Sequence, residues 1–513
     1  MLSEKVLSEF ATILPDEGRV GSADVGADIF LDRTHTFAEI PSWLTGKSYL
    51  VCNISSGVNF RVVDKGWVYL LTSELGKFSK VESLRQDGFE IVYTLEAGIF
   101  SSDISGRVAI LGKKMEVGDT LDCQGAWTVV FADIDKSYVD VDLRDGSMLA
   151  PNVIISPAEK LIEHPEYSIY LDGERKWQGM ASIAKDNNSG RLFATWYSGG
   201  KGEGSENFVV LYTSADDGKT WTGPVTVVHP FMKDVRAFDP NLWSDPYGRI
   251  WLIWTQSYNH TDGRFGVWAI RTENPELECP DWSKPVRIAN GVGICDPIVI
   301  QNAIGDLPKG AWLFPAAVWD RENVMESVRE ENHPNCYVSF DSGDSWSYYG
   351  SVPSTEAKRN YDENMIVENS NGTLTMYIRT EGGIEKSYSV DGKSWSPSVN
   401  AGITVTSARF WIGRLENGVL LAVYNAEGRR RMTAAISYDD GESWSHKLEL
   451  YEPYSIYPDV HIDSDGYIYI ITCENPFDNM KINMAKIRKE DIIAGEIVTE
   501  GCYLRAVIND NKK

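Results

Sequence analysis

Apolar residues recur in a regular pattern along the last two thirds of the chain. A polar turn with a glycine is followed by a strand in which apolar residues predominate, and this pairing is typical of a β-hairpin. Six copies read SGRLFATW, YGRIWLIW, KGAWLFPA, NGTLTMYI, NGVLLAVY and DGYIYIIT. Their turn glycines are Gly190, Gly248, Gly310, Gly372, Gly418 and Gly466. These glycines are separated by roughly 46 to 62 positions, which falls in the range of blade repeats.

A second motif lies between these strands: a serine, an aspartate, a glycine and a tryptophan at fixed spacing. Full copies are SADDGKTW at 214–221, SFDSGDSW at 339–346 and SYDDGESW at 437–444, and SVDGKSW at 389–395 is a shortened copy. A degenerate version of the motif, NPELECPDW, ends at Trp282 in the second repeat. Aspartate and glycine favour a tight turn, and tryptophan is suited to anchor that turn against neighbouring strands. The motif therefore indicates a hairpin that recurs in successive blades.

We predict an all-β protein with two domains. Residues 166–513 would form a six-bladed β-propeller, in which four-stranded blades around an axis close a ring and leave no long strand edge. Residues 1–165 lack the repeat and show short strand-like runs such as GWVYLLT, FEIVYTL, GRVAILG and WTVVFAD, with one helical segment at SKVESLRQDG. They would form a β-rich, sandwich-like accessory domain, joined to the propeller by residues 156–170.

The composition is that of a folded soluble protein, with 42% hydrophobic and 24% charged residues. The net charge of −25 argues against nucleic acid or an anionic membrane as a partner, and it means that an anionic substrate needs a local basic site. No stretch reaches transmembrane length, so we expect no membrane insertion. The amino-terminal residues lack the apolar core of a signal peptide. We therefore expect either a cytoplasmic protein or a secreted one whose leader is missing from this sequence.

The sequence shows no motif for a metal or a cofactor. The seven cysteines are scattered and none stands in a CxxC pair, so neither a zinc cluster nor a disulfide framework is predicted. The seven histidines have no metal-ligand spacing, and the chain has no phosphate-binding loop, dinucleotide fingerprint or GxSxG. We predict that the protein uses no metal and no cofactor.

The repeated Ser-x-Asp turns, known as Asp-boxes, on six predicted blades resemble the sialidase (neuraminidase) superfamily over about two thirds of the chain. The boxes are specific for the fold but weak evidence for function, because they also occur in propellers without activity. The resemblance implies a retaining exo-glycosidase that removes a terminal sialic acid. Such enzymes use a tyrosine nucleophile, a glutamate as its base, an aspartate as acid/base, and three arginines that grip the sugar carboxylate.

Four residues match the family pattern of nucleophile, base and arginines. In DENMIVENSNGTLTMYIRT, Glu363 matches the glutamate and Arg379 an arginine, and an exposed ion pair is the competing interpretation. In NAEGRRR, Arg429 matches another arginine, eight positions before an Asp-box, and a solvated basic loop is the alternative. In SIYPDVHIDSDGYIYIITCE, Tyr457 matches the nucleophile. Glu363 would take the phenol proton, and nearby cations would favour the phenolate.

Two further family positions diverge in this chain. The glycine-rich loop WYSGGKGEGSENFVV offers Glu203 and Glu206 where the family has an aspartate acid/base, and spacing favours Glu203 over Glu206; a mobile acidic loop is the alternative. The segment KWQGMAS has Gln178 where the family has its first arginine, and Arg175 lies outside the register. Two arginines still bind a carboxylate through charge-assisted hydrogen bonds, although less firmly than three. The substrate could then be another acidic sugar or a neutral one.

The remaining inward candidates are polar residues and tryptophans at the starts of predicted strands. Asp239 and Arg409 are candidates for substrate binding. Tryptophans that could stack on a sugar, if they are not core residues, are Trp177, Trp243, Trp319 and Trp411.

We predict removal of a terminal, acidic, sialic-acid-like sugar from a glycan or oligosaccharide by a Tyr/Glu nucleophile pair. One alternative is an exo-glycosidase for another sugar, such as a rhamnoside or uronide, which the missing arginine favours. The other is a glycan-binding propeller without activity.

Overall fold

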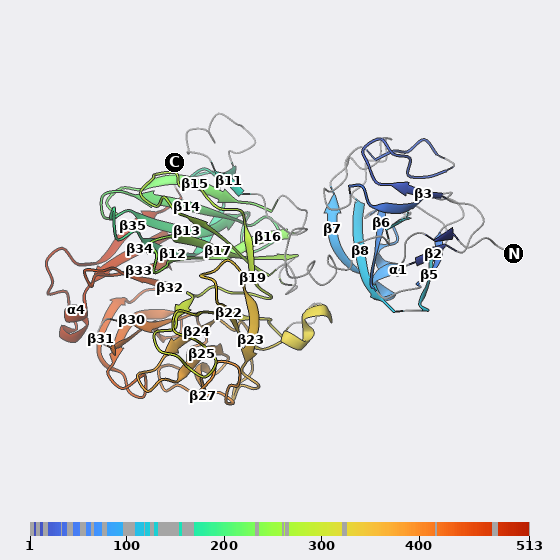
Figure 1. Ribbon diagram of the computed structural model, residues 1–513. Helices are drawn as coiled ribbons and strands as arrows, with labels where there is room; N and C mark the ends of the chain where they lie inside the picture. The colour runs from blue at the N-terminus through green and yellow to red at the C-terminus, as the bar shows by residue number, and fades with distance from the viewer. Residues whose placement is uncertain are drawn as a thin grey trace. The chain divides into compact units, whose positions relative to one another are not determined.

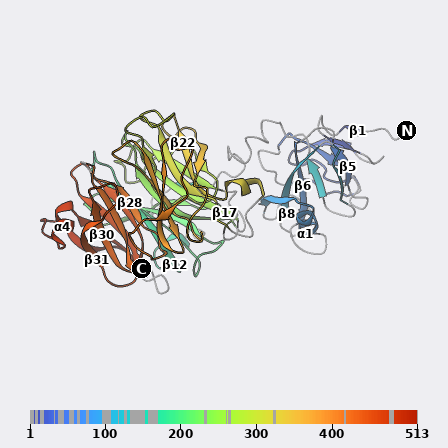
Figure 2. The same ribbon diagram turned by 90° about the horizontal axis from the view of Figure 1, so that it is seen from below.

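The computed structural model describes residues 5–6, 11–13, 19–31, 33–37, 45–51, 58–62, 66–73, 79–95, 108–116, 118–123, 128–131, 153–155, 169–230, 235–258, 261, 266–320, 326–415, 418–474 and 481–511. The chain falls into two compact units, Met1–Leu149 and Ala150–Lys513. Figures 1 and 2 colour the first unit blue and the second green to red.

The first unit contains two antiparallel sheets and a short helix. One sheet has the order β1 (Lys5–Val6), β2 (Ala11–Ile13), β5 (Val58–Val62), β9 (Thr120–Cys123). The other has the order β3 (Arg19–Ser22), β4 (Ser48–Val51), β10 (Thr128–Phe131), β6 (Gly66–Ser73), β8 (Val108–Met115), β7 (Glu90–Leu95). The four predicted strand runs all lie in this second sheet, and the predicted helix is α1 (Val81–Gln86), which buries Leu84.

The first unit ends before the predicted boundary at residue 165. Strand β11 (Val153–Ile155) pairs with β15 (Thr222–Val228) of the second unit, which draws this segment away from the first. Most of the predicted linker, 156–168, lies outside the described residues.

Among its described residues, the second unit has six antiparallel sheets, each a meander of four strands consecutive in sequence, with one additional edge strand in the first. Sheet 1 contains β12 (Trp177–Lys185), β13 (Leu192–Gly199), β14 (Phe208–Ser214) and β15, with β11 at its edge. Sheet 2 contains β16 (Val235–Ser244), β17 (Ile250–Tyr258), β18 (Val267–Thr272) and β19 (Val286–Ala289). Sheet 3 contains β20 (Ile298–Val299), β21 (Trp312–Ala317), β22 (Pro334–Ser339) and β23 (Ser347–Ser351). Sheet 4 contains β24 (Asn364–Glu368), β25 (Leu374–Thr380), β26 (Gly383–Ser389) and β27 (Val399–Asn400).

The last two sheets complete the unit. Sheet 5 contains β28 (Trp411–Arg414), β29 (Leu420–Glu427), β30 (Arg430–Ser437) and β31 (Ser445–Tyr451). Sheet 6 contains β32 (Ser455–Ile462), β33 (Ile468–Glu474), β34 (Lys481–Ile487) and β35 (Tyr503–Asn509). Two short helical turns, η2 (Glu326–Glu331) and α4 (Lys489–Ala494), lie between strands. No described helix has the length and hydropathy needed to cross a membrane.

The six predicted glycine turns are confirmed. Each lies between the first and second strands of its sheet, and all six glycines have left-handed φ values between 78° and 89°. Glycine adopts this conformation without the steric cost that a Cβ atom brings, so it marks the turn in every repeat.

Each Asp-box joins the third strand of its sheet to the fourth. In the first copy, Ser214 Oγ donates to Asp216 (2.8 Å) and accepts from the Gly218 amide (3.0 Å). Asp216 also accepts from the amide and hydroxyl of Thr220, and the Trp221 indole donates to the Gly218 carbonyl. The serine and aspartate bonds recur in the boxes at 339–346, 389–395 and 437–444. The motif therefore satisfies its own turn with internal hydrogen bonds.

The first strands of the sheets lie close to one another. Strand β12 of sheet 1 contacts β16 of sheet 2, and β24, β28 and β32 follow one another in the same way. Strand β32 of sheet 6 also contacts β12, so the last sheet packs beside the first; Figure 1 shows the red strands beside the green ones. Side chains at the ends of these first strands are thereby brought together from distant parts of the sequence.

Candidate functional site

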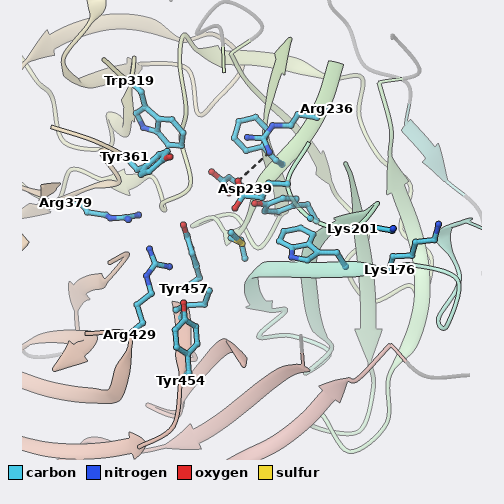
Figure 3. A pocket seen from close by; sticks show the side chains of 17 residues that line it. Lys176, Lys201, Arg236, Asp239, Trp319, Tyr361, Arg379, Arg429, Tyr454 and Tyr457 are labelled. Atoms are coloured by element: carbon cyan, nitrogen blue, oxygen red, sulfur yellow. Dashed lines mark ion pairs between the residues drawn. The ribbon is translucent and has the colours of Figure 1, made fainter. Parts of the chain in front are cut away.

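A cavity of about 530 Å³ lies where the first strands meet, and all six sheets or their connections contribute to it. The first strands of sheets 1, 2 and 6 provide Met180, Asp239 and Tyr457, and the hairpins of sheets 4 and 5 provide Arg379 and Arg429. Figure 3 shows the guanidinium groups of both arginines on one side of Tyr457 and Asp239 on its other side. This volume falls in the range of small-molecule binding sites.

The same backbone irregularity places three of these side chains. The pairing register shifts between Gly179 and Ser182 in β12, between Phe238 and Asn241 in β16, and between Ile456 and Asp459 in β32. Inside each bulge one residue has a left-handed backbone: Met180 (φ 50°), Asp239 (φ 47°) and Tyr457 (φ 55°). Non-glycine residues occupy this region at a cost of roughly 1–3 kcal/mol, and such bulges re-aim side chains near functional sites.

Tyr457 has a phenol that holds its proton tightly. Burial raises the pKa of Tyr457 well above its usual value of 10, Glu363 raises it further, and Arg379 only partly opposes them. Arg379 does favour the phenolate, as was predicted for a nearby cation, but it does not set the direction of the shift. The burial and the carboxylates around the phenol outweigh the arginine, so the phenol needs a base to remove its proton.

Glu363 and Arg379 form a buried ion pair behind the phenol. Glu363 Oε2 lies 2.8 Å from Arg379 Nη1, and the two side chains are 2% and 4% exposed. This excludes the interpretation of an exposed ion pair. Nε of Arg379 makes no hydrogen bond within the described residues. The guanidinium keeps its charge, because Glu363 and Tyr457 raise the pKa of Arg379 against the effect of burial. Arg379 thus retains an unused Nε–H donor, and its side chain lines the cavity.

The three consecutive arginines 429–431, at the hairpin between β29 and β30, do not all lie at the cavity. Arg429 lines the cavity. Arg430 pairs with Glu452 (2.9 Å) and Arg431 with Glu449 (2.9 Å), both on the outside of sheet 5. The structure therefore places the arginine that was matched to the family in the cavity, and its two neighbours on the surface.

The glycine-rich loop brings Glu203 to the cavity but not Glu206. Glu203 lines it and lies 3.7 Å from Arg236. Glu206 packs against Gly200 on the exposed side of the loop. Asn207 holds the loop in place, because its side chain accepts from the Gly204 amide (2.7 Å) and donates to the Gly202 carbonyl (3.0 Å).

Asp239 and Arg236 form the wall that faces Tyr457. Burial raises the pKa of Asp239 from 3.8 to about 8, and the carboxylates Glu203 and Glu363 contribute. Asp239 is therefore protonated at neutral pH. The Arg236 guanidinium lies 3.7 Å from the centre of the Phe238 ring and is buried. We did not predict Arg236, although its position in the strand that carries Asp239 is a usable signal.

Two residues predicted to bind substrate lie outside the cavity. Gln178 donates to Asn509 (2.9 Å) and accepts from Arg175 (3.2 Å), so its amide belongs to a buried network on the other side of β12. The bulge after Gly179 turns Met180 inward instead. Arg409 also lies elsewhere, because it donates to the carbonyls of Ile294 (2.6 Å) and Pro458 (3.0 Å).

Arg409 belongs to a polar network around Asp459. Arg409 donates to Asp459 (3.2 Å), which also accepts from Ser182 Oγ (2.5 Å) and the Ile183 amide (3.2 Å). Ser182 Oγ in turn accepts from the Leu242 amide (2.7 Å). These bonds join the first strands of sheets 1, 2 and 6 just beyond their bulges. The network therefore holds the three bulges in a fixed relation.

The four candidate tryptophans separate into two pairs. Trp177 and Trp319 line the cavity, and Trp319 packs edge-on against Tyr361 (centroids 5.0 Å apart). Trp243 and Trp411 instead line a second, separate hollow of about 400 Å³. Trp177 and Trp319 can thus offer an aromatic face to a ligand in the cavity.

The repeat-bearing part of the chain is similar to known proteins. Residues 190–470, more than half of the chain, match the model of the BNR repeat-like domain family. A protein of unknown function from Dyadobacter fermentans DSM 18053 is 17% identical, with a TM-score of 0.48, over 62% of this chain and 96% of its own. A Hadza microbial sialidase is 17% identical, with a TM-score of 0.46, over 91% and 99%. An intramolecular trans-sialidase from Ruminococcus gnavus is 14% identical, with a TM-score of 0.43, over 63% and 96%. No curated protein matches.

Proposed function

Because the chain belongs to the BNR repeat-like domain family, we propose that its cavity is the active site of a retaining exo-glycosidase for terminal acidic sugars. One observation carries the proposal: the phenol of Tyr457, aimed by its bulge, lies in one cavity with the guanidinium groups of Arg379 and Arg429. Two arginines suit a carboxylate on the sugar, because their N–H groups form charge-assisted, bidentate hydrogen bonds.

We propose that the six sheets close into a six-bladed propeller, with the first unit as a sandwich-like accessory domain. The contact between β32 and β12 supports closure, as do the contacts between first strands of adjacent sheets. The two antiparallel sheets of the first unit support a sandwich.

In the first step the Tyr457 oxygen bonds to the anomeric carbon and the glycosidic C–O bond breaks. The phenol proton passes to Glu363, the carboxylate that most strongly affects the phenol. Glu203, in its protonated form, protonates the leaving oxygen. In the second step Glu203 takes a proton from the water that attacks the anomeric carbon, the bond from that carbon to the Tyr457 oxygen breaks, and Glu363 returns its proton to the phenolate. Asp239, protonated at neutral pH, donates a hydrogen bond to a substrate hydroxyl. A phenol nucleophile avoids placing a carboxylate against the negative charge of the sugar.

The test is turnover of a panel of aryl glycosides by the wild-type protein and the variant Tyr457→Phe. We expect release from acidic glycosides and a loss of at least about a thousandfold in kcat for Tyr457→Phe. Mass spectrometry of protein treated with a fluorinated acidic glycosyl fluoride should place the sugar on Tyr457. Full activity of Tyr457→Phe would reject the nucleophile, and release from rhamnosides alone would reject the acidic sugar.

One observation favours a second function, glycan binding without turnover. Glu363 is held in a buried ion pair with Arg379, whose Nη1 lies 2.8 Å from Oε2, and this pairing opposes the uptake of a proton from the phenol. Binding of acidic glycans that is unchanged in Tyr457→Phe, with no release from any glycoside, would establish this function instead.

A further inference from the structure

The cavity concentrates positive charge in a strongly acidic protein. The whole chain has 49 basic and 74 acidic residues. The cavity lining reverses this balance, with five cationic side chains and two carboxyl groups, one of which is the protonated Asp239. The cations are Lys176, Lys201, Arg236, Arg379 and Arg429. Cationic clefts of this kind raise the local concentration of anions.

The cations lie in separate groups. Figure 3 shows Lys176 and Lys201 on the side of the cavity opposite Arg379 and Arg429. Trp177 also lines the cavity. A single carboxylate bound at the two arginines cannot also contact lysines on the opposite side of a cavity of about 530 Å³. The proposed function therefore leaves the lysine side unexplained.

The two lysines are the cations available for a second anion. Arg236 is partly neutralised by Glu203 at 3.7 Å and is stacked on Phe238. By contrast, no ion pair joins either lysine to a carboxylate of the described residues, and both side chains are exposed at the rim. Lysine ammonium groups bind compact anions such as sulfate or phosphate as point charges.

The glycine-rich loop that carries Lys201 indicates on which side of the scissile bond the two lysines lie. Lys201 and Glu203 stand two residues apart in the same glycine-rich loop, and both line the cavity. Glu203 is the group proposed to protonate the leaving oxygen. The lysine pair thus lies on the leaving-group side, across from the arginines that hold the terminal sugar.

We propose that the substrate is doubly anionic: an acidic terminal sugar joined to a leaving group that carries a sulfate or phosphate ester, bound by Lys176 and Lys201. This rests on the proposed function, because that assigns the arginine side to the terminal sugar. The ester is not cleaved; it positions the leaving group beside Glu203.

The experiment compares three disaccharides with the same acidic terminal sugar. The reducing sugar is unsubstituted, 6-O-sulfated or 6-O-phosphorylated. For the wild-type protein in low salt we expect kcat/KM to be roughly five- to twentyfold higher for at least one ester than for the unsubstituted disaccharide, with the ratio falling as salt is added. In the double variant Lys176→Ala/Lys201→Ala this ratio should fall to about 1.

A matched control is Lys219→Ala/Lys309→Ala, which removes two exposed lysines outside the cavity and changes the net charge equally. It should keep the wild-type ratio. A wild-type ratio near 1 for both esters, or a ratio unchanged in Lys176→Ala/Lys201→Ala, overturns the proposal. Preference for sulfate or for phosphate supports it and identifies the ester.

Calorimetric binding of the same disaccharides separates this proposal from the proposed function. If the protein hydrolyses none of them but binds an ester more tightly through the two lysines, the glycosidase assignment fails and the doubly anionic ligand stands. If it hydrolyses all three equally, the glycosidase assignment stands and the second anion site fails.

Discussion

Replacing Asp239 with asparagine should remove a cost to folding that grows with pH. Asp239 is 5% exposed, and burial followed by the charges of Glu203 and Glu363 raises its pKa from 3.8 to about 8. The folded state therefore keeps a proton that the unfolded chain releases above about pH 4. Stability contributed by this group is full below pH 3.8 and is lost as the pH rises to about 8.

The size of the effect follows from the shift. For each pH unit between the two pKa values, the free energy of unfolding falls by about 1.4 kcal/mol. Between pH 5 and pH 8, Asp239 should therefore lower the free energy of unfolding by roughly 3 to 4 kcal/mol. Asparagine has nearly the same shape and does not titrate, so Asp239→Asn should escape this loss. Asp239 therefore lies in the cavity at a cost in the stability of the folded protein, and this cost grows as the pH rises.

The assay is urea unfolding of the full chain at pH 5, 6, 7 and 8, followed by tryptophan fluorescence. The quantity compared is the difference in unfolding free energy between Asp239→Asn and wild type, because other titrating groups cancel in it. This difference should rise by roughly 3 to 4 kcal/mol from pH 5 to pH 8. The exposed control Asp281→Asn should stay parallel to wild type. A pH dependence of Asp239→Asn that parallels wild type within about 1 kcal/mol would refute the reasoning.

Two further substitutions test the network and the Asp-boxes. Arg409→Ala leaves Asp459 buried without its cation, and we expect a loss of roughly 3 kcal/mol or more in urea unfolding; a loss under about 1 kcal/mol would contradict the role of the pair. In Gly343→Ala the new Cβ would lie 2.5 Å from the Trp251 ring at a φ of 91°, so we expect a loss of roughly 2 to 4 kcal/mol. Gly372→Ala, with φ 79° and open space, isolates the backbone part of the cost and should lose less stability in the same urea-unfolding assay; equal losses would show that the Trp251 contact is unimportant.

Local features of the fold were predictable because their causes are local. A turn that requires a positive φ selects glycine wherever it occurs, so Gly190 and its five counterparts were visible in the sequence. Each Asp-box satisfies its own hydrogen bonds, so its sequence alone specifies its structure. The family match over residues 190–470 confirms the resemblance that these boxes indicated.

Features that depend on long-range packing were not predictable. Strand alternation assigns each residue to a face, but a bulge reverses that assignment, which is why Met180 and not Gln178 points into the cavity. Three consecutive arginines cannot be distinguished from the sequence alone, because two of them are identified as surface residues only by partners distant in sequence, such as Glu449 on the next strand. The direction of the Tyr457 pKa depends on how deeply a phenol is buried, which its neighbours in sequence do not reveal.

The three bulges have a consequence for how such a protein can evolve. Met180, Asp239 and Tyr457 sit in first strands, while the Asp-boxes that close the sheets follow the third strands. A substitution at a bulge position therefore changes the lining of the cavity without altering the Asp-box turns on which each repeat depends. The residues that shape the cavity and the residues that stabilise the repeats are thus separate sets, and each can be substituted without directly changing the other.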